Sequence, residues 1–84
     1  MQPYTTYEIE VHRAGKRLQE SFPSYMGLKI QQLQIVTGFS WGTVCNALSG
    51  LEEKGKAVSD KTKAGNRKHG SIRFKGRIPV RRSA

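Results

Sequence analysis

The stretch TGFSWGTVCNAL, Thr37–Leu48, decides how the rest of this sequence folds. Gly38 indicates a turn, and Ser40 is a residue type that favours the N-cap of a helix, because its hydroxyl accepts a hydrogen bond from a backbone N–H of the first turn. Phe39 and Val44 stand at the two positions of a hydrophobic staple, which fixes how a chain enters a helix. The stretch therefore predicts one helix ending, a glycine turn and a second helix beginning.

The apolar residues on both sides of this turn continue the two helices. Upstream, Ile30, Leu33 and Val36 are spaced by three, which predicts a short helix that ends at Gly38, and Leu28 could be a brief strand residue before it. Downstream, the pattern predicts a helix over about residues 41–54 that is closed by Gly55. Its expected buried stripe is Val44, Ala47, Leu48 and Leu51.

Another helix is predicted over about residues 6–21. Thr5 and Glu8 have the spacing of a capping box, in which each side chain bonds a backbone N–H at the helix start. Phe22-Pro23 is expected to end the helix, since a residue before proline is pushed out of the helical region. The expected apolar stripe of this helix is Tyr7, Val11, Ala14 and Leu18.

After Gly55 the apolar period changes from helical to two. Val58 is followed, across the polar loop KTKAGNRKHG, by Ile72 and Phe74, while Arg73 between them points the other way. This pattern predicts a β-hairpin with a mobile basic tip. The sequence thus reads as one domain over residues 1–76, with residues 77–84 as a basic, flexible tail.

The charge of the chain is unevenly distributed. The net charge is +9, from 15 Lys and Arg against 6 Asp and Glu. Residues 57–84 hold nine of the cationic residues and, in Asp60, one of the acidic ones, so this third of the chain carries +8. A nearly neutral body with a strongly cationic end indicates a polyanionic partner, although a solubilising basic tail is the simpler alternative.

Length and composition exclude several classes of protein. Eighty-four residues suit one small domain, and no apolar run exceeds two residues, which excludes a transmembrane helix or secretory signal core. The single cysteine, Cys45, excludes an internal disulfide and is typical of the cytoplasm. We find no metal-ligand spacing and no phosphate-cradling glycine motif, so we expect no enzyme, no cofactor and no metal.

The segment IQQLQIVTGFSWGTVCNALSGLEEKGKAV, residues 30–58, resembles the winged helix-turn-helix family found in MarR-like and PapI-like bacterial regulators. The resemblance implies an α+β fold of three helices and a C-terminal β-hairpin, the wing. It further implies a small bacterial, plasmid or phage transcription regulator that binds double-stranded DNA through its third helix in the major groove. The matching residues are Leu33, Gly38, Phe39, Ser40, Thr43-Val44, Ala47-Leu48 and the ending LEEKG.

On a helical wheel of the third helix, Gly42, Asn46 and Ser49 lie opposite the buried stripe, with Thr43 and Cys45 on the two flanks. Small side chains allow a close approach to DNA, and the Asn amide is matched to adenine. For Trp41, a core position and a DNA contact remain equally open.

Hydroxyls near the helix start and cations of the wing are suited to phosphates, and an arginine at a hairpin tip can enter a narrow minor groove. The expected DNA-binding set is Ser40, Trp41, Gly42, Thr43, Cys45, Asn46, Ser49, Lys61, Lys63, Asn66, Arg67, Lys68, His69 and Arg73.

One alternative to this function and the oligomeric state stay open. An RNA-binding or ribosome-associated protein would also use the basic segment, although paired RNA offers a helix little to read in its deep, narrow groove. A homodimer and a monomer assisted by a protein co-regulator are equally compatible with the sequence.

Overall fold

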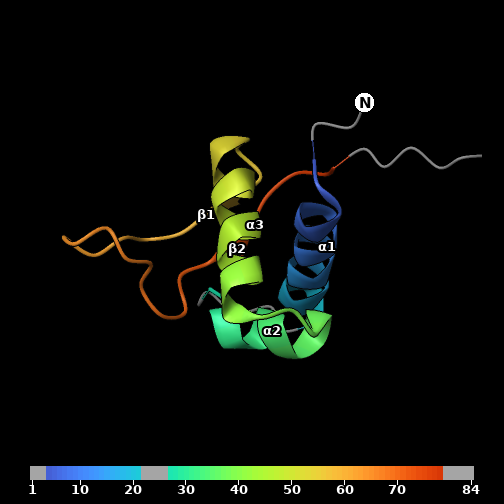
Figure 1. Ribbon diagram of the computed structural model, residues 1–84, viewed down its shortest axis with the longest axis horizontal. Helices are drawn as coiled ribbons and strands as arrows, with labels where there is room; N and C mark the ends of the chain where they lie inside the picture. Colours follow the sequence, from blue (N-terminus) through green and yellow to red (C-terminus); the bar gives the residue numbers. More distant parts are fainter. Residues whose placement is uncertain (1–3, 22–26, 79–84) are drawn as a thin grey trace, which may run out of the picture.

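The computed structural model describes residues 4–21 and 27–78. Three helices come first, α1 (Thr6–Ser21), α2 (Ile30–Thr37) and α3 (Trp41–Glu53), followed by two short strands, β1 (Ala57–Val58) and β2 (Arg73–Phe74). Figure 1 shows α3 alongside α1, α2 crossing below both, and the segment between the strands projecting to one side. The molecule is thus a small α+β fold, as expected.

The helices begin and end where their local signals predicted. Thr5 and Glu8 form the capping box of α1, with the Thr5 N–H 2.8 Å from Glu8 Oε1 and the Glu8 N–H 3.1 Å from Thr5 Oγ1. Gly38 ends α2 with a positive φ of 77°, which glycine adopts without steric cost. Ser40 caps α3 by accepting the Thr43 N–H at 3.3 Å. The predicted stop at Phe22-Pro23 lies outside the described residues.

The core lies between the three helices and the inner side of the sheet. Its largest fully buried side chains are Leu33, Leu48, Leu51, Ile72, Val11 and Val44. Two members of the expected stripes are not in it. Tyr7 is 54% exposed and packs edge-on against Phe39, with ring centroids 5.2 Å apart, and Val36 is 51% exposed. The apolar stripe expected on α1 therefore includes one residue, Tyr7, that the core does not bury.

The strands pair antiparallel, with Ala57 opposite Phe74 and Val58 opposite Arg73. On the other edge of β2, Leu28 forms an antiparallel bridge with Ile72, which confirms the brief strand residue expected before α2. Further along that edge, α1 supplies the partners. The Gln19 side-chain amide bonds both the N–H and the C=O of Phe74, and His12 Nε2 lies 2.9 Å from the Lys75 carbonyl oxygen.

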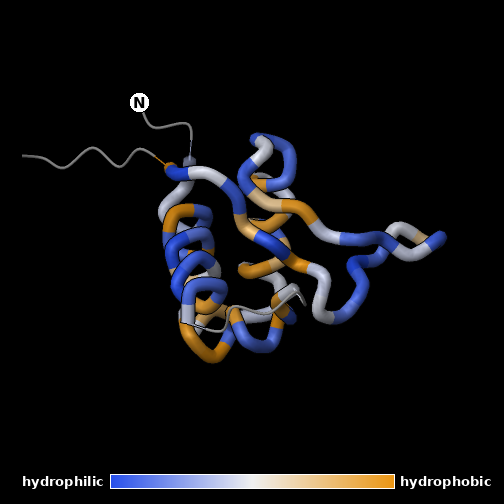
Figure 2. Tube along the Cα trace, turned by 180° about the vertical axis from the view of Figure 1, so that it is seen from behind, coloured by the Kyte–Doolittle hydropathy of each residue, from blue (hydrophilic) through white to orange (hydrophobic). Residues whose placement is uncertain are grey.

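We call residues 57–74 the hairpin arm. Beyond the two strands, Lys61 and Arg67 form a further antiparallel bridge, and the tip is a turn in which the Gly65 N–H lies 2.9 Å from the Thr62 carbonyl oxygen. Figure 2 shows that the arm is mostly hydrophilic along its outer part. The fold therefore places a polar, cationic arm beside α3.

Candidate nucleic-acid interface

Helix α3 has four sides, and three of them are covered. Val44, Ala47, Leu48 and Leu51 face the core, as the sequence predicted. A second side faces α1, where Gly50 lies against the side chain of Glu8. A third side faces the hairpin arm through Ser49 and Glu52. The fourth side is open to solvent in the part of the chain that the structure describes.

The open side of α3 contains Gly42, Asn46 and Glu53, all of them exposed. A Cβ atom at Gly42 would meet nothing within 4 Å in the part of the chain that the structure describes. No packing requirement therefore explains this glycine, although glycine in a helix costs about 1 kcal/mol relative to alanine. This side is accessible to a large partner, and its backbone can be approached closely at Gly42.

The start of α3 is organised by its cap. The Ser40 and Thr43 hydroxyls lie 2.9 Å apart, and Ser40 also accepts the Thr43 N–H. Both residues were expected to contact phosphates. Ser40 is exposed, but its hydroxyl already serves the helix, so its capacity for a further contact is reduced.

A groove of about 300 Å³ separates α3 from the hairpin arm. Trp41 is 51% exposed and lines this groove, which places the indole at the surface of the protein and not in the core. Cys45 lines it as well, and its partly buried side chain also packs against the core. The remaining lining residues among those that the structure describes are Lys29, Ile30, Gly65, Asn66, Arg67, Lys68, His69 and Ile72, and this described lining contains basic groups and no carboxylate.

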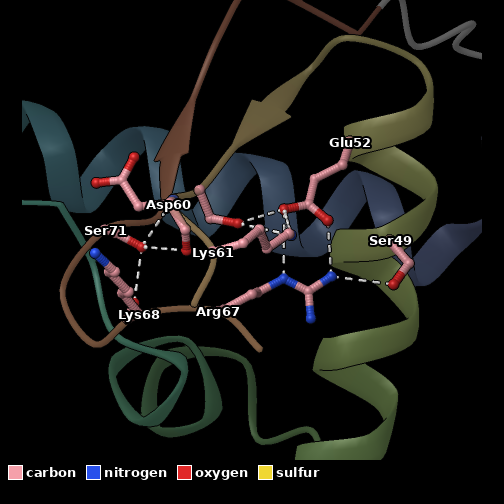
Figure 3. Close-up of polar contacts among 8 residues, drawn as sticks. Ser49, Glu52, Asp60, Lys61, Arg67, Lys68 and Ser71 are labelled. Atoms are coloured by element: carbon pink, nitrogen blue, oxygen red, sulfur yellow. Dashed lines mark hydrogen bonds and ion pairs between the residues drawn. The ribbon is translucent and has the colours of Figure 1, made fainter. Parts of the chain in front are cut away.

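A network of hydrogen bonds joins the arm to α3 (Figure 3). Arg67 Nη2 donates to Glu52 Oε1 at 2.8 Å and to Ser49 Oγ at 3.0 Å, and Arg67 Nε donates to Glu52 Oε2 at 3.4 Å. Lys61 Nζ and Ser59 Oγ also donate to Glu52 Oε2, at 2.9 and 2.5 Å. One carboxylate therefore accepts hydrogen bonds from three residues of the arm.

The electrostatics of Glu52 follow from these contacts. Burial raises the pKa of its carboxyl, but the hydrogen bonds from Arg67, Ser59 and Lys61 and the charge of Arg67 outweigh burial and lower the pKa from 4.5 to about 2. Glu52 is therefore ionised at neutral pH, and it compensates part of the positive charge of the arm.

Arg67 does not project from the hairpin tip, where the sequence suggested that an arginine could enter a minor groove. Its side chain is 16% exposed and lies against α3. Ser49, expected to face a DNA groove, is exposed but bonded to this guanidinium. The structure thus brings these two predicted site residues together, but they bond each other and are not both directed toward an external partner.

Other predicted residues of the arm remain on its surface. Lys63, Asn66, Lys68 and His69 are exposed. Arg73 points outward from β2 while Phe74 points inward, as the alternation predicted, and Arg73 also makes a contact within the protein. Below the tip, Ser71 Oγ accepts the Asp60 N–H and donates to the Lys68 carbonyl, which fixes the backbone that carries these side chains.

The sequence analysis missed residues of this interface, among them Glu52, Ser59 and Lys29. Glu52 follows Ser49 by three positions and Cys45 by seven, so a helical wheel places all three on one flank of α3. This spacing, with the cations expected in the following hairpin, was the available signal. Lys29 gave no such signal, because its place at the groove depends on how α2 packs.

Comparisons with protein-family models, curated proteins and solved structures found no match for this chain. Within residues 4–21 and 27–78, no helix is long and apolar enough to cross a bilayer. The same residues contain no group of three or more His, Cys, Asp or Glu side chains that could hold a metal ion. A function must therefore be inferred from the interface itself.

Proposed function

We propose that this chain is a sequence-specific, double-stranded DNA-binding protein of the winged helix-turn-helix type, acting as a small transcription regulator. The first turns of the open side of α3, which contain Gly42 and Asn46, enter the major groove, and the helix leaves the groove before Glu53. The hairpin arm is the wing, which contacts the phosphate backbone or the minor groove.

The observation that carries this proposal is the open side of α3 beside a cationic arm. Gly42 and Asn46 are exposed near the start of the helix, and nothing lies within 4 Å of a Cβ at position 42 among the described residues. The first turns of a recognition helix are the part that contacts base edges in helix-turn-helix proteins. The amide of Asn46 can accept from adenine N6 and donate to N7 through two separate atoms, which is the bidentate pairing that specifies adenine.

The arm supplies the electrostatic part of binding. Lys63, Lys68 and His69 are exposed on it, and Lys68 and His69 line the groove together with Trp41. Cations placed against phosphates release bound counterions, and this gives affinity without sequence preference. We thus assign the recognition of bases to α3 and the sequence-independent part of the DNA affinity to the arm.

The test begins with selection of bound sequences from random duplex DNA by the full chain. Asn46→Ala is then compared with the double variant Lys63→Ala/Lys68→Ala on the selected site and on a scrambled duplex. We expect Asn46→Ala to reduce the discrimination between the two duplexes by about 1–3 kcal/mol, the usual contribution of one bidentate base contact. The double variant should weaken binding to both duplexes alike and reduce the log–log salt slope by about 0.9 for each phosphate that it no longer neutralises.

Two outcomes would contradict the proposal. Full discrimination by Asn46→Ala would show that the open side of α3 does not read bases. A wild-type preference for structured RNA of the same length over every duplex DNA would replace DNA by RNA as the partner.

A further inference from the structure

Glu52 links the two limbs of the hairpin arm to α3. Ser59 and Lys61 belong to the limb that leaves β1, and Arg67 belongs to the limb that returns toward β2. Five hydrogen bonds from these three side chains end on Glu52 or Ser49. The strands at the base of the arm are only two residues long each, so the strands alone give the outer arm little support.

The same contacts limit what Arg67 can do. A guanidinium has five N–H donors, and here Nε and both hydrogens of Nη2 are directed at Glu52 and Ser49. Arg67 thus cannot place a two-nitrogen fork on a guanine while it is held in this way, because a fork needs a second nitrogen with free hydrogens. Its role in this arrangement is to hold the arm.

Two cations of the arm share one carboxylate. Lys61 and Arg67 both lie within 2.9 Å of Glu52 oxygens, so these three residues together contribute a net +1 to the interface. Loss of the carboxylate would leave two cations free to move to any phosphate within reach. The arm would gain electrostatic attraction and lose its fixed position.

We infer that Glu52 is a positioning residue that fixes the wing against the recognition helix, and that it thereby increases sequence discrimination at the expense of overall DNA affinity. This inference rests on the proposed function. It assigns the role to an acidic residue, which on charge alone would only repel DNA.

The experiment compares Glu52→Gln with Glu53→Gln. Both variants remove one negative charge from the last turn of α3, but Glu53 is exposed, lies about two turns beyond the base-reading residue Asn46, and takes no part in the five bonds that hold the arm. Affinity for the selected site and for the scrambled duplex is measured over a series of salt concentrations. Both variants should bind DNA more tightly than wild type, because both lose a repulsive charge.

Only Glu52→Gln should also lose specificity. We expect its preference for the selected site to fall about 3–10-fold, and its salt slope to increase by about 0.9 for each cation that reaches a phosphate, up to two. Glu53→Gln should keep the wild-type preference. The variant Arg67→Lys provides a second, independent test. It preserves the charge but lacks the planar fork by which Nε and Nη2 of Arg67 reach both Glu52 oxygens and Ser49, so it should lose preference in the same way.

Wild-type preference that survives in both Glu52→Gln and Arg67→Lys would overturn the role of Glu52, and so would equal effects of Glu52→Gln and Glu53→Gln. These results leave the proposed function intact. A wild-type protein with no preference among duplexes would instead overturn the proposed function, and with it the role of Glu52 in discrimination.

Discussion

The carboxylate of Glu8 on α1 lies directly against Gly50 of α3 and occupies the space that a side chain at position 50 would need. Glu8 is 5% exposed, and its oxygens accept the Thr5 N–H and two hydrogen bonds from Lys54 Nζ, at 2.8 and 3.0 Å. The ammonium of Lys54 also lies 4.9 Å from the centre of the Tyr4 ring. The glycine therefore serves the packing of α1 against α3.

Gly50→Ala should destabilise the fold by about 1–2 kcal/mol, although alanine is the better helix former by about 1 kcal/mol. A methyl group at this position displaces the Glu8 carboxylate, which weakens the capping box of α1 and the buried contact with Lys54. Chemical denaturation measures the change. A variant more stable than wild type would mean that Glu8 moves aside without losing its partners.

Gly42→Ala should have the opposite effect on stability. The new methyl group meets nothing within 4 Å among the described residues, so the variant should gain up to about 1 kcal/mol from helix propensity alone. In the proposed DNA complex the same methyl group stands between backbone and base edges, so affinity for the selected site should fall. Thermal melting and DNA titration of one preparation check both effects. An unchanged affinity of Gly42→Ala for the selected site would show that Gly42 does not lie at the DNA interface.

Gln19→Ala should cost about 1–3 kcal/mol, the range for leaving buried backbone groups unpaired. The Gln19 amide bonds the N–H and C=O of Phe74 at the edge of β2, and alanine can bond neither. Glu20→Ala is the matched control, since Glu20 is the exposed neighbour on the same helix. Amide exchange at Phe74 reports the effect locally. Equal exchange rates of the Phe74 amide in the two variants would contradict a role of Gln19 at the edge of β2.

The contribution of Glu52 to stability should be insensitive to pH near neutrality and should fade only in acid. Its pKa is lowered from 4.5 to about 2, so the stabilisation is fully present above about pH 4.5 and is lost as the pH falls through about 2. The difference in unfolding free energy between wild type and Glu52→Gln should therefore narrow across this window. NMR of the Glu52 carboxyl carbon gives the midpoint of its titration directly. A midpoint near pH 4.5 would show that Arg67 and Lys61 do not bind the Glu52 carboxylate in solution.

The helices could be predicted from the sequence because their signals are local. Thr5 with Glu8, Gly38 and Ser40 each act within four residues, and the structure has all three in the expected roles. The spacing of Ile30, Leu33 and Val36 predicted a helix that ends at Gly38, but Val36 is exposed. A helix of eight residues has few neighbours, and periodicity does not indicate which of its sides they cover.

The interface was less predictable, because its contacts join distant positions. The open side of α3 followed from the wheel, since Gly42 and Asn46 are exposed. The bond between Arg67 and Glu52 spans 15 positions and depends on the path of the arm. A charge count cannot distinguish a cation that faces solvent, such as Lys63, from one that is bonded to a neighbouring helix.

The edge of β2 that faces away from β1 has consequences for engineering and for the modularity of the domain. Leu28, Gln19 and His12 supply the partners of Ile72, Phe74 and Lys75, so the returning strand is completed by residues from the first third of the chain. A hairpin transplanted here from another protein would keep its own turn and lack these three attachments. Such an arm can be exchanged only together with the matching positions at Leu28 and on α1, so the arm and these segments must vary as a single unit.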